Sequence, residues 1–219
     1  MSVAIITAVW GTYWDRFGQA FQDSTAKLDP AAAQVIVASP TPLDVADHVQ
    51  NVQFSGERMW DSFSAAAQAV TADWIWAVGI DDTYPADALA NLPRDCDVIS
   101  VAGQRSDGIH WAANPNGYDK ILGIGYNPMQ GSCIVHRHVW QLAPWRRVVW
   151  PDWMQWLEIR KLGLKVAFDP KPRYHFLRHE GAHSMNASAI GEAEIDQMRG
   201  ILRAGHVKPG LVFPPEPVE

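Results

Sequence analysis

Residues 73–85 read Asp-Trp-Ile-Trp-Ala-Val-Gly-Ile-Asp-Asp-Thr-Tyr-Pro. The nearly continuous apolar run from 73 to 80 is typical of a strand that is buried on both faces of a parallel sheet. The run leads directly into Asp81 and Asp82. Open α/β sheets bind their ligands beyond the carboxyl ends of the strands. The two carboxylates therefore predict a functional site at this end of the strand.

The sequence before this segment alternates between short apolar runs and stretches with helical spacing. Residues 3–9 and 34–38 predict buried strands, and residues 14–28 and 59–71 predict helices. Strand, helix, strand, helix, strand is the order of a parallel sheet with helices packed on it. We therefore expect an α/β fold with a central, mostly parallel sheet flanked by helices.

The sequence after this segment is less regular. A Gly-, Asn- and Asp-rich stretch covers residues 104–130. Around it we expect strands at 97–101, 132–136 and 165–168 and helices at 153–163 and 188–204. The Pro-rich end of the chain predicts an irregular tail.

Composition places the chain among globular proteins. It has 219 residues, of which 47% are hydrophobic and 19% charged, which suits one α/β domain. The first residues lack the basic region of a signal peptide, and no apolar run approaches the roughly 18 residues of a membrane span. We expect a cytoplasmic protein with no membrane span, in which Cys96 and Cys133 are free thiols.

The net charge of −6 is unevenly distributed. Residues 1–136 carry 6 Lys and Arg against 15 Asp and Glu, whereas residues 137–178 carry 9 against 3. This division suits a metal-holding first part and a second part that meets anions, and it equally suits an ordinary scatter of surface charge.

Two groups of carboxylates could carry chemistry. Asp81 and Asp82 offer oxygen ligands to Mn²⁺ or Mg²⁺, or they could cap a helix at residues 85–92. Asp152 lies among Trp150, Trp153 and Trp156 where a helix should begin, so it could be a general base, the N-cap of that helix, or both.

Three histidines, His175, His179 and His183, lie four residues apart. Gly181 argues against a helix that would align them as a zinc site, so we favour one histidine completing a site with the distant aspartates. The sequence contains no Gly-rich phosphate loop, no Gly-x-Ser-x-Gly elbow and no Cys/His nucleophile pattern. These absences disfavour dehydrogenases, P-loop enzymes and hydrolases.

The order of the segments along residues 3–184 resembles that of the GT-A glycosyltransferases, particularly glycosyltransferase family 2. Residues 5–11 (Ile-Ile-Thr-Ala-Val-Trp-Gly) resemble the family's first strand along the nucleotide, and residues 72–89 resemble its metal-binding Asp-x-Asp strand. Residues 150–157 (Trp-Pro-Asp-Trp-Met-Gln-Trp-Leu) look like its Glu-Asp-Trp segment, and residues 174–184 like its closing strand and loop. Three positions depart from the pattern: Gly79 replaces the first aspartate of Asp-x-Asp, Pro151 replaces the glutamate before the base, and Ser39 ends the second strand in place of an acidic residue.

The resemblance implies a role for each matching residue. Asp81 and His179 would hold Mn²⁺ or Mg²⁺, with His175 and His183 as alternatives to His179, and Asp152 would be the catalytic base. Trp153 and Trp156 would contact the acceptor or pack in the core. The residues expected to bind a UDP- or GDP-type nucleotide-sugar donor are Ala8, Val9, Trp10, Ser39, Arg58, Asp82 and Arg178.

The resemblance also implies a division of the chain. Residues 1–205 would form a GT-A-like domain, with a nucleotide-binding half at 1–100, an acceptor half at 101–184 and a terminal helix at 185–205; residues 206–219 would form the tail. The expected reaction is metal-dependent, inverting transfer of a sugar to a hydroxyl of an anionic glycan or lipid, a protein or a hydroxylated DNA base. Nucleic acid is possible but not favoured, because the overall charge is negative. The alternatives are a catalytically silent GT-A-like module that binds a nucleotide or sugar, and a metal-dependent nucleotidyltransferase.

Overall fold

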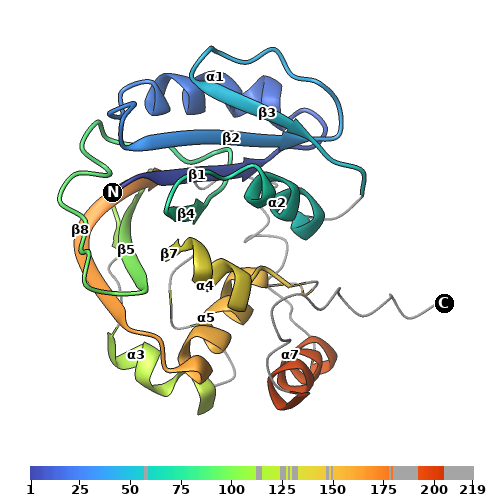
Figure 1. Ribbon diagram of the computed structural model, residues 1–219, viewed down its shortest axis with the longest axis vertical. Coiled ribbons are helices and arrows are strands. Elements are labelled where there is room, and N and C mark those ends of the chain that lie inside the picture. The colour runs from blue at the N-terminus through green and yellow to red at the C-terminus, as the bar shows by residue number, and fades with distance from the viewer. Residues whose placement is uncertain are drawn as a thin grey trace.

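The computed structural model describes residues 1–56, 59–111, 115–123, 127, 129, 133–146, 148, 150–177, 179 and 192–204. Its centre is an eight-stranded sheet in the order β3-β2-β1-β4-β7-β5-β6, with β8 also paired to β5 (Figure 1). The strands are β1 Val3–Ala8, β2 Ala33–Ser39, β3 Val49–Gln53, β4 Trp74–Ala77, β5 Val98–Arg105, β6 His110–Trp111, β7 Ile134–His136 and β8 Val166–Phe176.

The sheet has a parallel half and a mixed half. β1 pairs in parallel with both β2 and β4, and β2 with β3. β7 is antiparallel to β4 and β5, β6 is antiparallel to β5, and β8 is parallel to β5. The result is the expected single α/β domain with a mostly parallel, mixed sheet.

Helices cover both faces of the sheet, which is why β1 is apolar throughout. Val3 and Ile5 face a core that includes Phe21 of α1, whereas Ala4 and Ile6 face a core with α2, α4 and α5. Figure 1 shows α1 and α2 on opposite sides of β1 and β2. The helices are α1 Tyr13–Thr25, α2 Met59–Gln68, α3 Pro115–Lys120, α4 Arg137–Leu142, α5 Pro151–Leu162 and α7 Glu192–Ala204, with a 3-10 turn, η1, at Ile121–Gly123.

Several elements differ from the sequence-based expectations. β3 was not predicted, since it is a half-exposed strand without an apolar run. The helix expected at residues 85–92 is instead a series of turns. β8 continues to Phe176 through Pro170 and Pro172. Proline has no backbone N–H to donate to a neighbouring strand, and the pairing with β5 is irregular beside Pro172. Residues 206–219, the predicted tail, lie outside the described residues.

Over the described parts of the chain, no helix combines the length and the apolar character that crossing a membrane requires.

Candidate active site

Asp81 and His179 meet at the carboxyl end of β4, although 98 positions separate them in the sequence. Asp81 lies four residues after β4, and its Oδ2 is 3.0 Å from His179 Nε2. Nearby, Thr83 and His175 exchange two backbone hydrogen bonds of 2.9 and 2.8 Å. This bridge anchors the end of β8 beside the Asp81–Asp82 turn, so the short segment after β8 brings His179 to Asp81.

The start of α1 supports the His179 ring. The imidazole packs against Phe17 at 4.8 Å between ring centroids and against the edge of Tyr13 at 6.1 Å. The exposed guanidinium of Arg16 lies over the Phe17 ring at 4.8 Å. One cation and the first turn of α1 therefore adjoin the Asp81–His179 pair.

The adjacent aspartates have different surroundings. The side chain of Asp81 is 21% exposed, whereas Asp82 is buried and accepts a hydrogen bond of 3.1 Å from the backbone N–H of Gly79. Burial first, and the neighbouring charge of Asp81 second, raise the pKa of Asp82 well above its usual value. The turn therefore presents Asp81 to ligands and turns Asp82 inward.

Gly79 leaves room for the carboxylate of Asp81. A Cβ atom at residue 79 would collide with Asp81 Oδ1 and approach Asp82 Oδ2 to 3.4 Å. A side chain at this position, such as the first aspartate of an Asp-x-Asp motif, would displace the carboxylate that meets His179. The glycine is thus matched to the local turn.

Asp152 lies at the start of α5. It is the second residue of the helix, after Pro151, and the N-cap is Trp150, so Asp152 is not the N-cap. Burial first, and then the charges of Asp82 and Asp152, raise the pKa of Tyr174 above its usual value.

The residues predicted to bind the donor lie at the ends of β1 and β2. Ala8 and Val9 are buried, and Trp10 packs edge-on against Phe54 at 5.5 Å. Among the described residues, the buried indole N–H of Trp10 has no hydrogen-bond partner. The hydroxyl of Ser39 donates to the carbonyl of Thr41 at 2.6 Å and accepts from Asn51 at 2.8 Å. Arg58 and Arg178 lie outside the described residues.

The two tryptophans predicted to contact an acceptor are in the core. Trp153 is 4% exposed and Trp156 is 1% exposed, and both belong to the core on the face of the sheet that α2, α4 and α5 cover. Stacking of an acceptor on either ring would require the exposure of a packed side chain. Both side chains therefore pack in the core, which was one of the two roles considered for them.

The donor atoms at Asp81 and His179 suit a divalent cation bound to a substrate. Within the described residues no group of three His, Cys, Asp or Glu side chains converges. One carboxylate and one imidazole are nevertheless enough when phosphate oxygens and water complete the coordination, which is how Mg²⁺ commonly binds. The residues present therefore fit a metal that arrives with a diphosphate better than a closed structural site.

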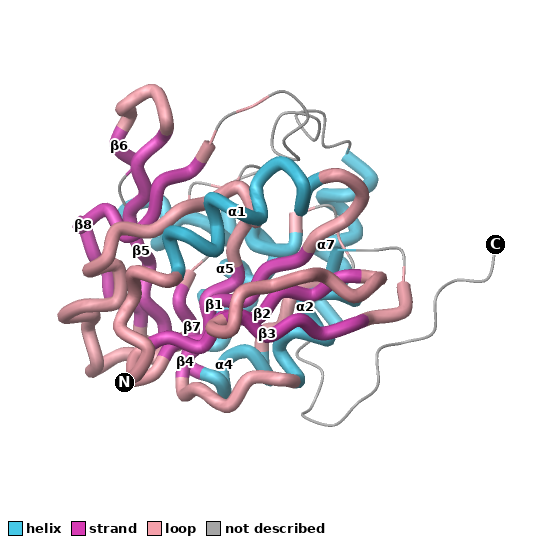
Figure 2. Tube along the Cα trace, turned by 90° about the horizontal axis from the view of Figure 1, so that it is seen from above, coloured by secondary structure: helices cyan, strands magenta, loops and turns pink. Residues whose placement is uncertain are grey.

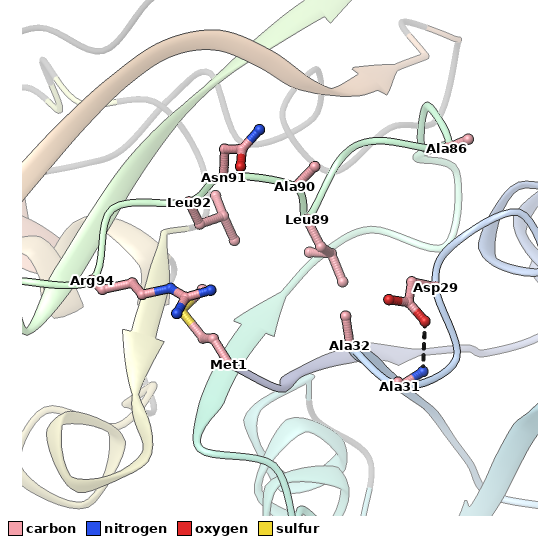
Figure 3. A pocket seen from close by; sticks show the side chains of 10 residues that line it. All are labelled: Met1, Asp29, Ala31, Ala32, Ala86, Leu89, Ala90, Asn91, Leu92 and Arg94. Atoms are coloured by element: carbon pink, nitrogen blue, oxygen red, sulfur yellow. Dashed lines mark hydrogen bonds between the residues drawn. The ribbon is translucent and has the colours of Figure 1, made fainter.

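A cavity of about 350 Å³ lies at the opposite end of the strands. Met1 and Ala32, which precede β1 and β2, line it together with the turns at 86–94 (Figure 3). None of the predicted site residues that the structure describes lines this cavity. Its lining is mainly alanine and leucine, with Asp29, Asn91 and Arg94 as the polar members.

Sequence reasoning missed Tyr174 and the support that α1 gives to His179. Tyr13 and Phe17 have the four-residue spacing of one helical face, which was a usable signal. Tyr174 had none, because its position beside the turn after β4 depends on how β8 pairs with β5 and on the bridge between His175 and Thr83.

Comparisons with known proteins agree on the fold. No protein-family model matches the sequence, and no curated protein sequence is significantly similar to it. Among solved structures, residues 1–349 of Staphylococcus aureus TarS in complex with UDP-GlcNAc match with a TM-score of 0.68 and 13% identity, over 93% of this chain and 66% of that one. The mannosyltransferase PcManGT from Pyrobaculum calidifontis, in complex with GDP-Man and Mn²⁺, matches with a TM-score of 0.55 and 11% identity, over 93% of this chain and 70% of that one. The chain thus spans about two thirds of each of these structures, and its fold is the GT-A type that the sequence predicted.

Proposed function

We propose that this protein is a glycosyltransferase that moves a sugar from a nucleotide-sugar donor to an acceptor hydroxyl. The observation that carries the proposal is the meeting of Asp81 with His179 at the carboxyl end of β4, on a fold shared with structures that hold UDP-GlcNAc or GDP-Man. This is the end of a parallel sheet where ligands bind.

The donor lies across the ends of β1, β2 and β4. Residues 1–100 form the donor half, in which the turns after β1 and β2 receive the nucleoside, and residues 101–184 form the acceptor half. Asp81 and His179 hold Mn²⁺ or Mg²⁺, which when bound offsets the charge that develops on the diphosphate leaving group. Arg178 and Arg58 supply further positive charge to the phosphates.

Asp152 accepts the proton in the transfer step. The acceptor oxygen attacks the anomeric carbon from the face opposite the diphosphate, the bond to the diphosphate oxygen breaks, and the proton of the acceptor hydroxyl passes to Asp152. The product therefore has inverted configuration. Asp152 is the second residue of α5, in its first turn. A carboxylate at a helix N-terminus interacts favourably with the helix dipole, so this position suits a general base.

The experiment has a binding step and a turnover step. Thermal unfolding is followed with a panel of UDP- and GDP-sugars, with and without Mn²⁺, in the wild type and in Asp81→Ala. The matched control is Asp95→Ala, because Asp95 is an exposed aspartate before β5, at the other end of the sheet, and forms an ion pair with Lys165. We expect a Mn²⁺-dependent shift for one nucleotide that Asp81→Ala loses and Asp95→Ala keeps.

Turnover is measured as the release of nucleoside diphosphate. Asp152→Asn should keep the nucleotide-dependent shift and lose about 10²–10⁴-fold in rate, which is the usual contribution of a general base. Pyrophosphate release would instead favour a nucleotidyltransferase. Binding without turnover, with any acceptor, would favour a silent binding module. No shift with any nucleotide would overturn the donor site.

A further inference from the structure

The β5–β6 hairpin carries an exposed apolar surface. Of the four large hydrophobic side chains that are most exposed in the described residues, Ile109 (51%) and Trp111 (48%) lie on this hairpin, and Leu177 (39%) follows β8, which pairs with β5. Figure 2 shows the hairpin projecting beyond the rest of the sheet. Exposed apolar groups that gather in one place commonly mark a binding surface.

Three aromatic rings connect this surface to the interior. The rings of Trp111 and Phe176 are 5.3 Å apart and tilted by 38°, and those of Phe176 and Tyr174 are 6.0 Å apart with the same tilt. Gly103 of β5 makes room for the row, because a Cβ there would collide with the Tyr174 ring. Gly103 is also the register partner of Trp111 in β6.

The row begins beside the candidate active site. Its inner member, Tyr174, is 6% exposed and precedes His175, whose backbone exchanges two hydrogen bonds with Thr83, next to Asp82. Its outer member, Trp111, presents about half of its side chain to solvent. A molecule whose reactive end lies in this site could therefore extend along the row to Trp111.

We propose that Trp111 and Phe176 form a subsite for a carbohydrate acceptor, in which one sugar ring stacks on Trp111 while another presents its hydroxyl to Asp152. The assignment rests on the glycosyltransferase function proposed above. A pyranose has an apolar C–H face and a polar rim, so it matches a flat exposed ring. Trp111 supplies such a ring, because it is flat and about half exposed.

A carbohydrate suits this surface better than the other acceptors considered. Nucleic-acid bases also stack on aromatic rings, but their phosphates require a basic groove. The one arginine of the hairpin, Arg105, is neutralised by its ion pair with Asp107, and the chain carries a net charge of −6. A stable protein partner would need about 800 Å² on each side, more than a few side chains on a hairpin provide.

The test measures oligosaccharide binding without a nucleotide. Tetrasaccharides of glucose, mannose and N-acetylglucosamine and a single-stranded oligonucleotide are titrated against the full chain by saturation-transfer NMR. The variants are Trp111→Ala, Trp111→Phe and the control Leu122→Ala, which removes an equally exposed apolar residue outside the row (54%). Thermal unfolding confirms that each variant is folded.

We expect at least one tetrasaccharide to bind, with affinity reduced on the order of tenfold in Trp111→Ala, largely restored in Trp111→Phe and unchanged in Leu122→Ala. Equal binding by wild type and Trp111→Ala would overturn the subsite. Tighter binding of the oligonucleotide than of every tetrasaccharide, or no sugar binding at all, would overturn it too. The nucleotide-dependent thermal shift of the wild type reports separately on the donor site. Sugar binding without that shift would therefore refute the proposed function alone, and the shift without sugar binding would refute the subsite alone.

Discussion

The two halves of the sheet bury different kinds of polar group. Among the described residues around β1, β2 and β4, the buried polar side chains are five hydroxyls and one carboxylate: Thr7, Ser24, Thr25, Ser39, Ser62 and Asp82. Around β5, β8 and α5 they include two arginines and two acids: Ser100, Arg146, Gln155, Glu158, Asp169 and Arg173. The second half therefore buries two ion pairs within its apolar core, Arg146 with Glu158 and Arg173 with Asp169.

The charged pairs of the second half brace the elements that carry the site. Arg146 Nη2 lies 2.8 Å from Glu158 Oε1 in α5, the helix that carries Asp152 in its first turn. Arg173 of β8 pairs with Asp169 and also donates to the carbonyl of Ala90 at 2.6 Å. This second pair ties the turns that follow Asp82 to the strand that leads to His179.

The largest effect is expected from breaking the pair behind α5. Arg146→Met leaves the carboxylate of Glu158 buried without its partner and should cost about 3–5 kcal/mol of unfolding free energy. Burial already raises the pKa of Glu158 despite Arg146, so the cost should shrink as the pH falls and the carboxyl becomes neutral. Urea unfolding at pH 8 and pH 5 measures both effects.

The double variant Arg146→Met/Glu158→Met is the control for this pair. Because it removes both charges, it should recover most of the lost stability. A cost below about 1 kcal/mol for Arg146→Met would mean that the second half does not depend on its ion pairs.

A smaller effect is expected in the first half. Ile36 of β2 is fully buried among apolar side chains. Ile36→Val removes one methylene and should cost about 1 kcal/mol, equally at pH 5 and pH 8 and at low and high salt. The same urea titrations provide the measurement. A strongly pH-dependent cost would show that charges also hold this half together and would remove the contrast.

The smallest effect, a gain, is expected at the one buried carboxylate of the first half. Asp82 has a raised pKa when folded, so the folded state binds more protons between the unfolded pKa of about 3.9 and the folded value. Stability therefore falls as the pH rises through that window. Asp82→Asn has no such charge and can still accept the hydrogen bond from Gly79.

The stability of Asp82→Asn relative to wild type should therefore increase from pH 4 to pH 8, as measured by chemical unfolding. If Asp82→Asn instead became less stable than wild type as the pH rises, the ionised carboxylate would stabilise the fold. Burial and the charge of Asp81 would then not be what dominates at this residue.

The same contrast explains how far prediction from the sequence could go. In the first half β1, β2 and β4 were expected close to their observed bounds, because buried strands read as apolar runs and α1 as a helical period. In the second half β6 was missed, and so was the stretch of β8 at residues 169–173, which joins the strand expected at 165–168 to the closing strand that the resemblance placed from residue 174. These segments contain polar residues and prolines and are strands because they pair with β5. The sequence pattern within each segment does not reveal that pairing.

The sequence by itself determined the α/β class, the parallel strands and the place of Asp81 at a strand end, since these follow from patterns a few residues long. Only the tertiary structure decided that His179 meets Asp81, 98 positions away, and that the backbone of His175 pairs with that of Thr83. Sequence patterns a few residues long do not encode such contacts, because they form only when β8 lies beside β5.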